Sequence, residues 1–193
     1  MFMRHRALFA APACLVALLL ISGFTATPAR ADQLDQFQLG HDYGFWFEQD
    51  VERWQEVVPG LPLMTRLYLL LDKEGQPGNV VVTLVRADDG EVLATRTILE
   101  DDVPGMGWAM IQFDPPLTVP VGEMIRVEVA ADQPSSDPQN RYFWLGLTEI
   151  DAYPLGDSDV EDGWPGYDYA FQTYGMGETP AQGQPWSAVK AVY

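Results

Sequence analysis

The sequence predicts an all-β fold made of antiparallel sheets, and three observations support this fold class. Short runs of alternating apolar residues recur roughly every 8–12 residues, turns rich in Gly and Pro separate them, and no segment sustains a helical period. Strands with one apolar side are typical of antiparallel sheets that have one face on the core and the other in solvent. The pattern therefore indicates a sandwich or a barrel.

The first 31 residues are predicted to be a secretory signal peptide and are excluded from the fold. Arg4 and Arg6 precede an apolar stretch centred on 15–21, and a small-x-small cleavage motif follows at 29–31. The alternative, an uncleaved membrane anchor, is disfavoured because the apolar stretch is near the lower limit for spanning a bilayer. Cys14, the single cysteine of the chain, lies within this segment, so the exported domain is expected to contain no disulfide.

The strands of the domain follow in order along the chain. Residues 32–44 are predicted to be a linker, 45–175 the sandwich, and 176–193 a tail or an edge strand. Within the sandwich, a hairpin is expected at 87–91 (ADDGE), because Asp-Gly suits the positive φ of a tight turn. The prolines of 115–120 are expected to end the preceding strand. The predicted strands are 66–71, 80–85, 92–99, 108–114, 124–130, 141–150 and 167–175.

The core is predicted from the apolar positions that share one side of each strand. On the strand at 141–150, Phe143 and Leu145 are assigned to the core, and Tyr142 and Trp144 to the opposite face. The full predicted core is Leu67, Leu69, Leu71, Val82, Leu84, Ile111, Phe113, Val127, Val129, Phe143, Leu145 and Phe171.

The charge of the chain limits its partners. The net charge is −17, and removal of the first 31 residues, which hold three arginines and no acidic residue, leaves −20. Nucleic acid is excluded as a partner, since such binding depends on Lys and Arg at phosphates. An anionic membrane surface is disfavoured for the same reason. A hydrophobic content of 47% nevertheless predicts a packed core.

Catalysis is not expected. After signal removal the chain has one histidine, His41, and no cysteine, and its serines lie in no nucleophile-elbow context. A histidine-based triad or a zinc site thus has a single candidate. Carboxylate pairs suited to a glycosidase occur by chance among 28 acidic residues, so a secreted carboxylate-dependent hydrolase is the least favoured alternative.

Exposed aromatic rings beside polar groups point to carbohydrate binding, because the C–H faces of sugars pack on flat rings. Tyr142, Trp144, Trp164 and Tyr167 are predicted to form such a platform. Asn140 and Arg141 would hydrogen-bond the hydroxyls. The alternative is that these rings are buried, as Trp and Tyr often are, and Trp108 is assigned to that structural role.

The loop with the sequence GDSDVEDGWPGYD is the candidate metal site. Carboxylates at alternate positions suit calcium, which takes six to eight oxygen ligands, although the spacing is not that of an EF-hand. A solvated acidic loop is the alternative. The candidate ligands are Asp157, Asp159, Glu161, Asp162 and Asp168.

Four segments in this order, GQPGNVVVTLV, GEVLAT, VPGMGWAMIQFDPPLTVPVGE and DYAFQTYG, resemble a jelly-roll β-sandwich module of secreted bacterial proteins. That module is similar to galactose-binding-like and carbohydrate-binding domains. The resemblance implies a two-sheet jelly roll over 45–175 and raises the expectation of a structural calcium ion.

The resulting hypothesis is a secreted or periplasmic, non-catalytic binding module for a neutral carbohydrate. An envelope structural or protein-interaction domain is the alternative.

Overall fold

A computed structural model describes residues 32–134, 137, 139–148, 151–160, 163–164 and 166–177. The predicted signal peptide and residues 178–193 of the predicted tail lie outside these ranges. The elements of the described part are β1 (Gln33–Gln38), β2 (Tyr43–Phe47), β3 (Arg53–Val57), β4 (Leu63–Glu74), β5 (Val80–Arg86), β6 (Val92–Ile98), the 3-10 helix η1 (Glu100–Asp102), β7 (Gly107–Thr118), β8 (Ile125–Ala131), β9 (Arg141–Leu147), β10 (Asp168–Tyr169) and β11 (Phe171–Met176).

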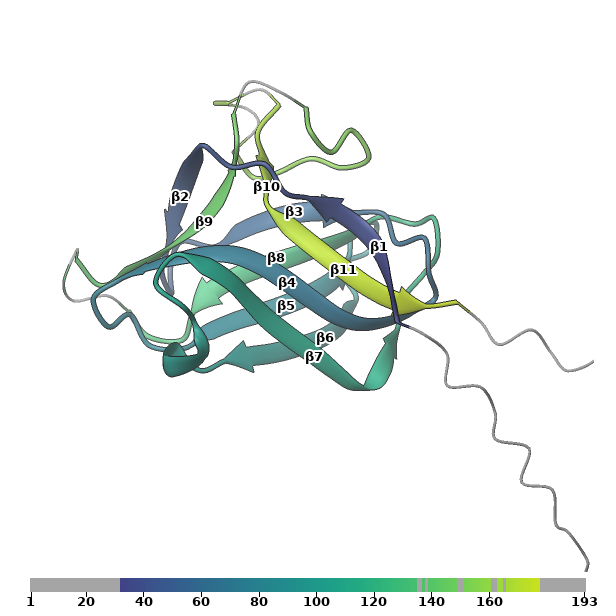
Figure 1. The fold of residues 1–193 in the computed structure, drawn as a ribbon, viewed down its shortest axis with the longest axis horizontal. Coiled ribbons are helices and arrows are strands. Elements are labelled where there is room, and N and C mark those ends of the chain that lie inside the picture. The colour runs from purple at the N-terminus through teal and green to yellow at the C-terminus, as the bar shows by residue number, and fades with distance from the viewer. Residues whose placement is uncertain are drawn as a thin grey trace, which may run out of the picture.

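The strands form two antiparallel sheets that pack face to face, so the predicted fold class is confirmed (Figure 1). The smaller sheet has the order β3-β8-β5-β6. In the larger sheet, β4 is central and pairs with β7 along one edge. Its other edge is shared, because β11 pairs with β4 up to Leu69 and β9 pairs with it from Leu71 onward. The larger sheet therefore forks, with β1 beyond β11 on one branch and β2 beyond β9 on the other.

The apolar core lies between the two sheets, and most of it was predicted. Alternating residues of β4, β5, β7, β8 and β11 point inward and are at most 4% exposed. Burial of these aliphatic and aromatic side chains is the main stabilising contribution to the fold. The predicted core residues that the structure confirms are Leu67, Leu69, Leu71, Val82, Leu84, Ile111, Phe113, Val127, Val129 and Phe171.

The prediction for β9 is wrong, because the strand turns its other face to the core. Tyr142 and Trp144 are fully buried, whereas Phe143 and Leu145 are partly exposed on the outer face of the larger sheet. The polar atoms of the buried rings are satisfied: Trp144 Nε1 donates to the Ala170 carbonyl oxygen at 3.0 Å, and the Tyr142 hydroxyl donates to the Gly78 carbonyl oxygen. With these bonds made, burial of the larger rings is favourable.

The predicted linker at 32–44 is also wrong, since β1 and the start of β2 lie within it. β1 pairs with β11, and Gln38 is buried with its side-chain amide donating to the Asp168 carbonyl oxygen at 2.8 Å. The domain consequently begins at β1.

The prolines at 115 and 116 do not end the strand as predicted. β7 continues through them to Thr118, with a register irregularity opposite β4 between Met64 and Arg66. Among the described residues β7 pairs only with β4, so it is an edge strand, where a missing backbone N–H is tolerated.

Candidate functional site

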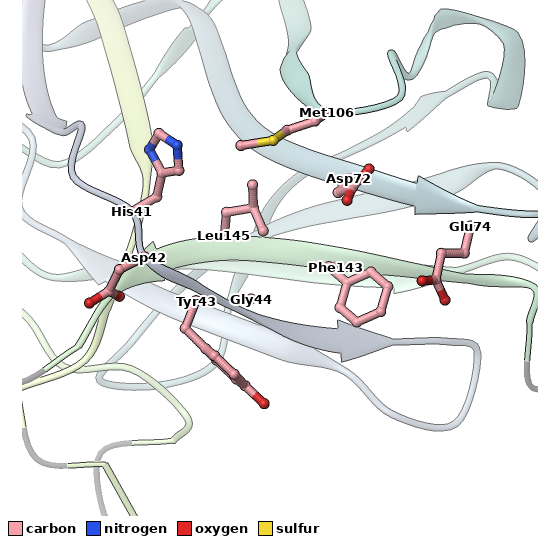
Figure 2. A pocket seen from close by; sticks show the side chains of 9 residues that line it. All are labelled: His41, Asp42, Tyr43, Gly44, Asp72, Glu74, Met106, Phe143 and Leu145. Atoms are coloured by element: carbon pink, nitrogen blue, oxygen red, sulfur yellow. The ribbon is translucent and has the colours of Figure 1, made fainter.

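A hollow of about 510 Å³ opens on the outer face of the larger sheet, where β2, β9 and the end of β4 lie side by side (Figure 2). It is lined by apolar side chains and carboxylates in nearly equal number, together with a histidine. The lining residues are His41, Asp42, Tyr43, Gly44, Asp72, Glu74, Met106, Phe143 and Leu145.

The floor of the hollow comes from the outward side of β9. Phe143 lies directly opposite Trp46 of β2 and opposite Asp72 of β4, so these three residues form one row across three strands. In the next row, Leu145 lies opposite Gly44. A Cβ atom on Gly44 would lie 2.5 Å from Leu145 Cδ2, so the glycine leaves room for the leucine side chain.

Two of the three carboxylates have strong partners. Asp42 accepts hydrogen bonds from the Thr148 backbone N–H at 2.9 Å and from its hydroxyl at 2.7 Å. Glu74 accepts from Arg141 Nε at 3.0 Å, and the Arg141 guanidinium lies 4.9 Å from the centre of the Phe143 ring. A cation is thus held between an aromatic ring and a carboxylate on one side of Phe143.

Asp72, the third carboxylate, lies on β4 directly opposite Phe143, two residues before Glu74. It is half-buried and accepts a hydrogen bond from the Lys73 backbone N–H at 2.8 Å. The Lys73 ammonium group donates instead to the Glu100 carbonyl oxygen at 2.8 Å. Within the described residues, neither Asp72 nor Asp42 pairs with a cation.

The predicted aromatic platform does not form. Tyr142, Trp144 and Tyr167 are at most 1% exposed, so the prediction of exposed rings is wrong for these three. Trp164 is 43% exposed and stacks on Tyr43, with ring centres 5.2 Å apart. Trp164 also meets Phe45 edge to face, so it lies on the face of β2 opposite to Phe143 and Leu145.

Asn140 and Arg141 lie at the opposite end of the site. Both line a second hollow of about 520 Å³, which shares Glu74 with the first. Asn140 accepts a hydrogen bond from the Gln76 backbone N–H at 3.0 Å. Of the predicted ligand-binding residues, Arg141 and Asn140 are therefore brought to the border of the first hollow, and none of the predicted set forms its floor.

The structure brings together two of the predicted calcium ligands, Asp157 and Asp168, which line one small hollow of about 40 Å³ with Asp151. Asp159 pairs with Arg53 at 2.7 Å, and Asp157 is exposed. Glu161 and Asp162 lie outside the described residues. The part of the chain that the structure describes contains no group of three or more His, Cys, Asp or Glu side chains that could hold a metal ion. Calcium binding stays a prediction, which chelation at constant ionic strength would test through the melting temperature.

Asp168, the fifth predicted ligand, anchors a loop. Its carboxyl accepts hydrogen bonds from the Tyr153 backbone N–H at 2.8 Å and from Gln55 Nε2 at 3.2 Å. Gln55 Oε1 in turn accepts from the Tyr169 backbone N–H at 2.9 Å. Asp168 is 3% exposed, and burial raises the pKa of its carboxyl to about 6. These bonds tie residues 151–160 to β3 and β10.

Sequence reasoning missed the residues that form the floor and the acidic wall, among them Asp72 and Phe143. Both sides of β9 are apolar, so alternation alone could not identify the outward side. The signal that was present is Gly44 next to aromatic residues of β2, since a glycine inside a strand often marks a close approach of neighbouring groups.

In the described residues, no helix has the length and apolar character needed to cross a membrane.

Comparison with solved structures gives similar chains, among them two from particles of infectious bursal disease virus. No protein-family model matches the sequence, and no curated protein matches it. One similar structure is a chain of the T13 particle of infectious bursal disease virus, with 13% identity, a TM-score of 0.35, and coverage of 77% of this chain and 36% of that one. The other is the VP2 subviral particle of the same virus, with 11% identity, a TM-score of 0.35, and coverage of 88% and 42%. The chain thus spans less than half the length of either.

Proposed function

We propose that the protein is an exported, non-catalytic binding module. Its ligand is a carbohydrate without acidic groups, in the first place a neutral glycan. The observation that supports this is the hollow on β2, β9 and β4, which combines an apolar floor with hydrogen-bonding walls. The sequence resemblance to carbohydrate-binding modules favours the same class of function.

A sugar ring has the surface that this hollow would complement. Its C–H face packs on Phe143 and Leu145, which are partly exposed. Its hydroxyl groups donate to Asp42 and Asp72, whose carboxylates accept only. Trp46, in the same row as Phe143 and 38% exposed, extends the apolar surface for a neighbouring ring.

The charges of the site argue against anionic glycans. Asp42, Asp72 and Glu74 line the hollow, and Arg141 offsets only Glu74 directly. An acidic sugar would bring like charges together, in addition to the repulsion from a chain of net charge −17.

The test is a glycan panel read by tryptophan fluorescence and calorimetry, with Phe143→Ala as the variant. Loss of a stacking ring is expected to weaken binding by about 1–3 kcal/mol, by analogy with bases stacked on aromatic rings. Phe37→Ala is the matched control, because Phe37 is an exposed aromatic residue on β1 of the same sheet and does not line the hollow. Equal affinity of wild type and Phe143→Ala, or no glycan response at all, would contradict the proposal.

A protein-interaction domain is the second candidate, and β1 favours it. Within the described residues β1 pairs only with β11, and it carries the exposed apolar residues Leu34 and Phe37, followed by Leu39. Open strand edges can add a strand from another chain. Self-association in sedimentation velocity that Phe37→Lys abolishes, together with no glycan response, would favour this function.

A further inference from the structure

Two carboxylates that line the hollow lie near Phe143. Glu74 pairs with a cation, and Asp72 pairs with none among the described residues. On one side of Phe143, Glu74 and the aromatic ring hold the Arg141 guanidinium, with a nitrogen–oxygen distance of 3.0 Å and a cation–ring distance of 4.9 Å. The contact shows that a cation is stable at this ring beside a carboxylate.

Asp72 is a second carboxylate beside the same ring, two residues before Glu74 on β4. It lies directly across from Phe143 in the β4–β9 register, and it pairs with no cation among the described residues. Figure 2 shows Asp72 on β4, with Met106 next to it in this view and Phe143 on the adjacent strand. A half-buried carboxylate with apolar neighbours attracts a positive charge more strongly than a fully solvated one, because screening by water is reduced.

We propose that the sugar bound most tightly in this hollow carries a protonated amino group that pairs with Asp72. The ligand class is an amino sugar with a free amine, as in partly or fully deacetylated chitin-like chains. The inference rests on the proposed function and narrows its ligand class. The sugar ring packs on the apolar floor as before, and its ammonium group supplies a cationic partner for Asp72. Asp42, at the other end of the hollow, adds a second negative charge without a cationic partner.

The test compares the trimer of N-acetylglucosamine, whose nitrogens are neutral amides, with the trimer of glucosamine, whose nitrogens are free amines. Calorimetry is done at about pH 6, where an amine of this kind is protonated. We expect the glucosamine trimer to bind about tenfold more tightly, as a charge-assisted hydrogen bond allows. The difference is expected to shrink as salt concentration rises.

The variant Asp72→Asn separates this pairing from general attraction to an acidic protein. It is expected to remove the preference for the amine, whereas the affinity for the N-acetyl trimer falls less, because the asparagine Oδ1 still accepts a hydroxyl hydrogen bond. Asp88→Asn is the control, because it removes the same charge from an exposed hairpin residue between β5 and β6.

Other results of these titrations would contradict either the pairing with Asp72 or the proposed function. Equal affinity for the two trimers, or equal effects of Asp72→Asn and Asp88→Asn, would overturn the pairing with Asp72 and leave the proposed function in place. Binding of other neutral glycans without either trimer would do the same. A protein that binds no glycan at all would contradict the proposed function as well.

Discussion

The buried carboxyl of Asp168 is expected to couple the stability of the fold to pH. Burial raises its pKa from an ordinary value of 3.8 to about 6, even though the Tyr153 backbone N–H and the Gln55 side chain donate hydrogen bonds that act in the opposite direction. The folded state therefore holds the proton more tightly than the unfolded chain does. The contribution of Asp168 to the unfolding free energy is therefore greatest below about pH 4, and it decreases as pH rises through about 6.

The size of the effect follows from the two pKa values. The rise from 3.8 to about 6 corresponds to about 3 kcal/mol of unfolding free energy, lost between about pH 4 and pH 6.5 and constant above that. Because Asp168 is 3% exposed, screening by solvent reduces this figure little.

Asp168→Asn isolates this contribution. The asparagine cannot titrate, so the part of the pH dependence that comes from Asp168 is expected to disappear. Its amide also places an N–H opposite one of the two donors, the Tyr153 N–H or Gln55 Nε2, which costs about 1–3 kcal/mol relative to the ionised carboxylate. Urea unfolding at four values between pH 4.5 and 7.5 measures both effects. Asp88→Asn, on an exposed side chain, is the control. An unfolding free energy of Asp168→Asn that changes with pH as the wild type's does would refute the reasoning.

Three further predictions follow from single contacts. Trp144→Ala is expected to lower the unfolding free energy by about 3–5 kcal/mol in urea titrations, far more than Phe143→Ala, because the indole is fully buried. Gly44→Val is expected to displace the Leu145 side chain, because a Cβ atom at position 44 would lie 2.5 Å from Leu145 Cδ2, and to weaken glycan binding in calorimetry more than it lowers the melting temperature. Arg53→Ala leaves the mostly buried Asp159 without its ion-pair partner at 2.7 Å, and we expect a lower melting temperature that Asp159→Asn in the same chain partly restores.

The sequence was sufficient to predict the fold class and most of the core, because the pattern that identifies a buried side lies within each strand. Leu67, Leu69 and Leu71 share one side of β4, and the structure buries that side in the core. β1 was missed because its sequence, QLDQFQ, has no clear apolar side. Its place in the sheet depends on β11, more than 130 residues later in the chain.

The face of β9 depends on contacts that no local pattern contains. Tyr142 and Trp144 alternate with Phe143 and Leu145, so either pair satisfies the period of a strand. Which pair is buried depends on groups that are distant in the sequence, among them the Ala170 carbonyl oxygen, which accepts a hydrogen bond from the Trp144 N–H. The predicted sugar platform was placed on the wrong face for this reason.

The residues of the candidate site come together only through strand pairing. Asp42 precedes β2, Asp72 is near the end of β4, and Phe143 is on β9, so more than 100 residues separate the first from the last. Their proximity follows from the β2–β9 and β9–β4 registers, which a single sequence does not reveal.

The location of glycan binding tests the central claim most directly. Backbone amide resonances of the protein, followed during titration with the tightest-binding glycan of the panel, report which residues the ligand contacts. We expect the largest shifts at Gly44, Asp72, Phe143 and Leu145, which line the hollow. Shifts confined to the β1 edge or to residues 151–160, or spectra that no glycan changes, would contradict the account.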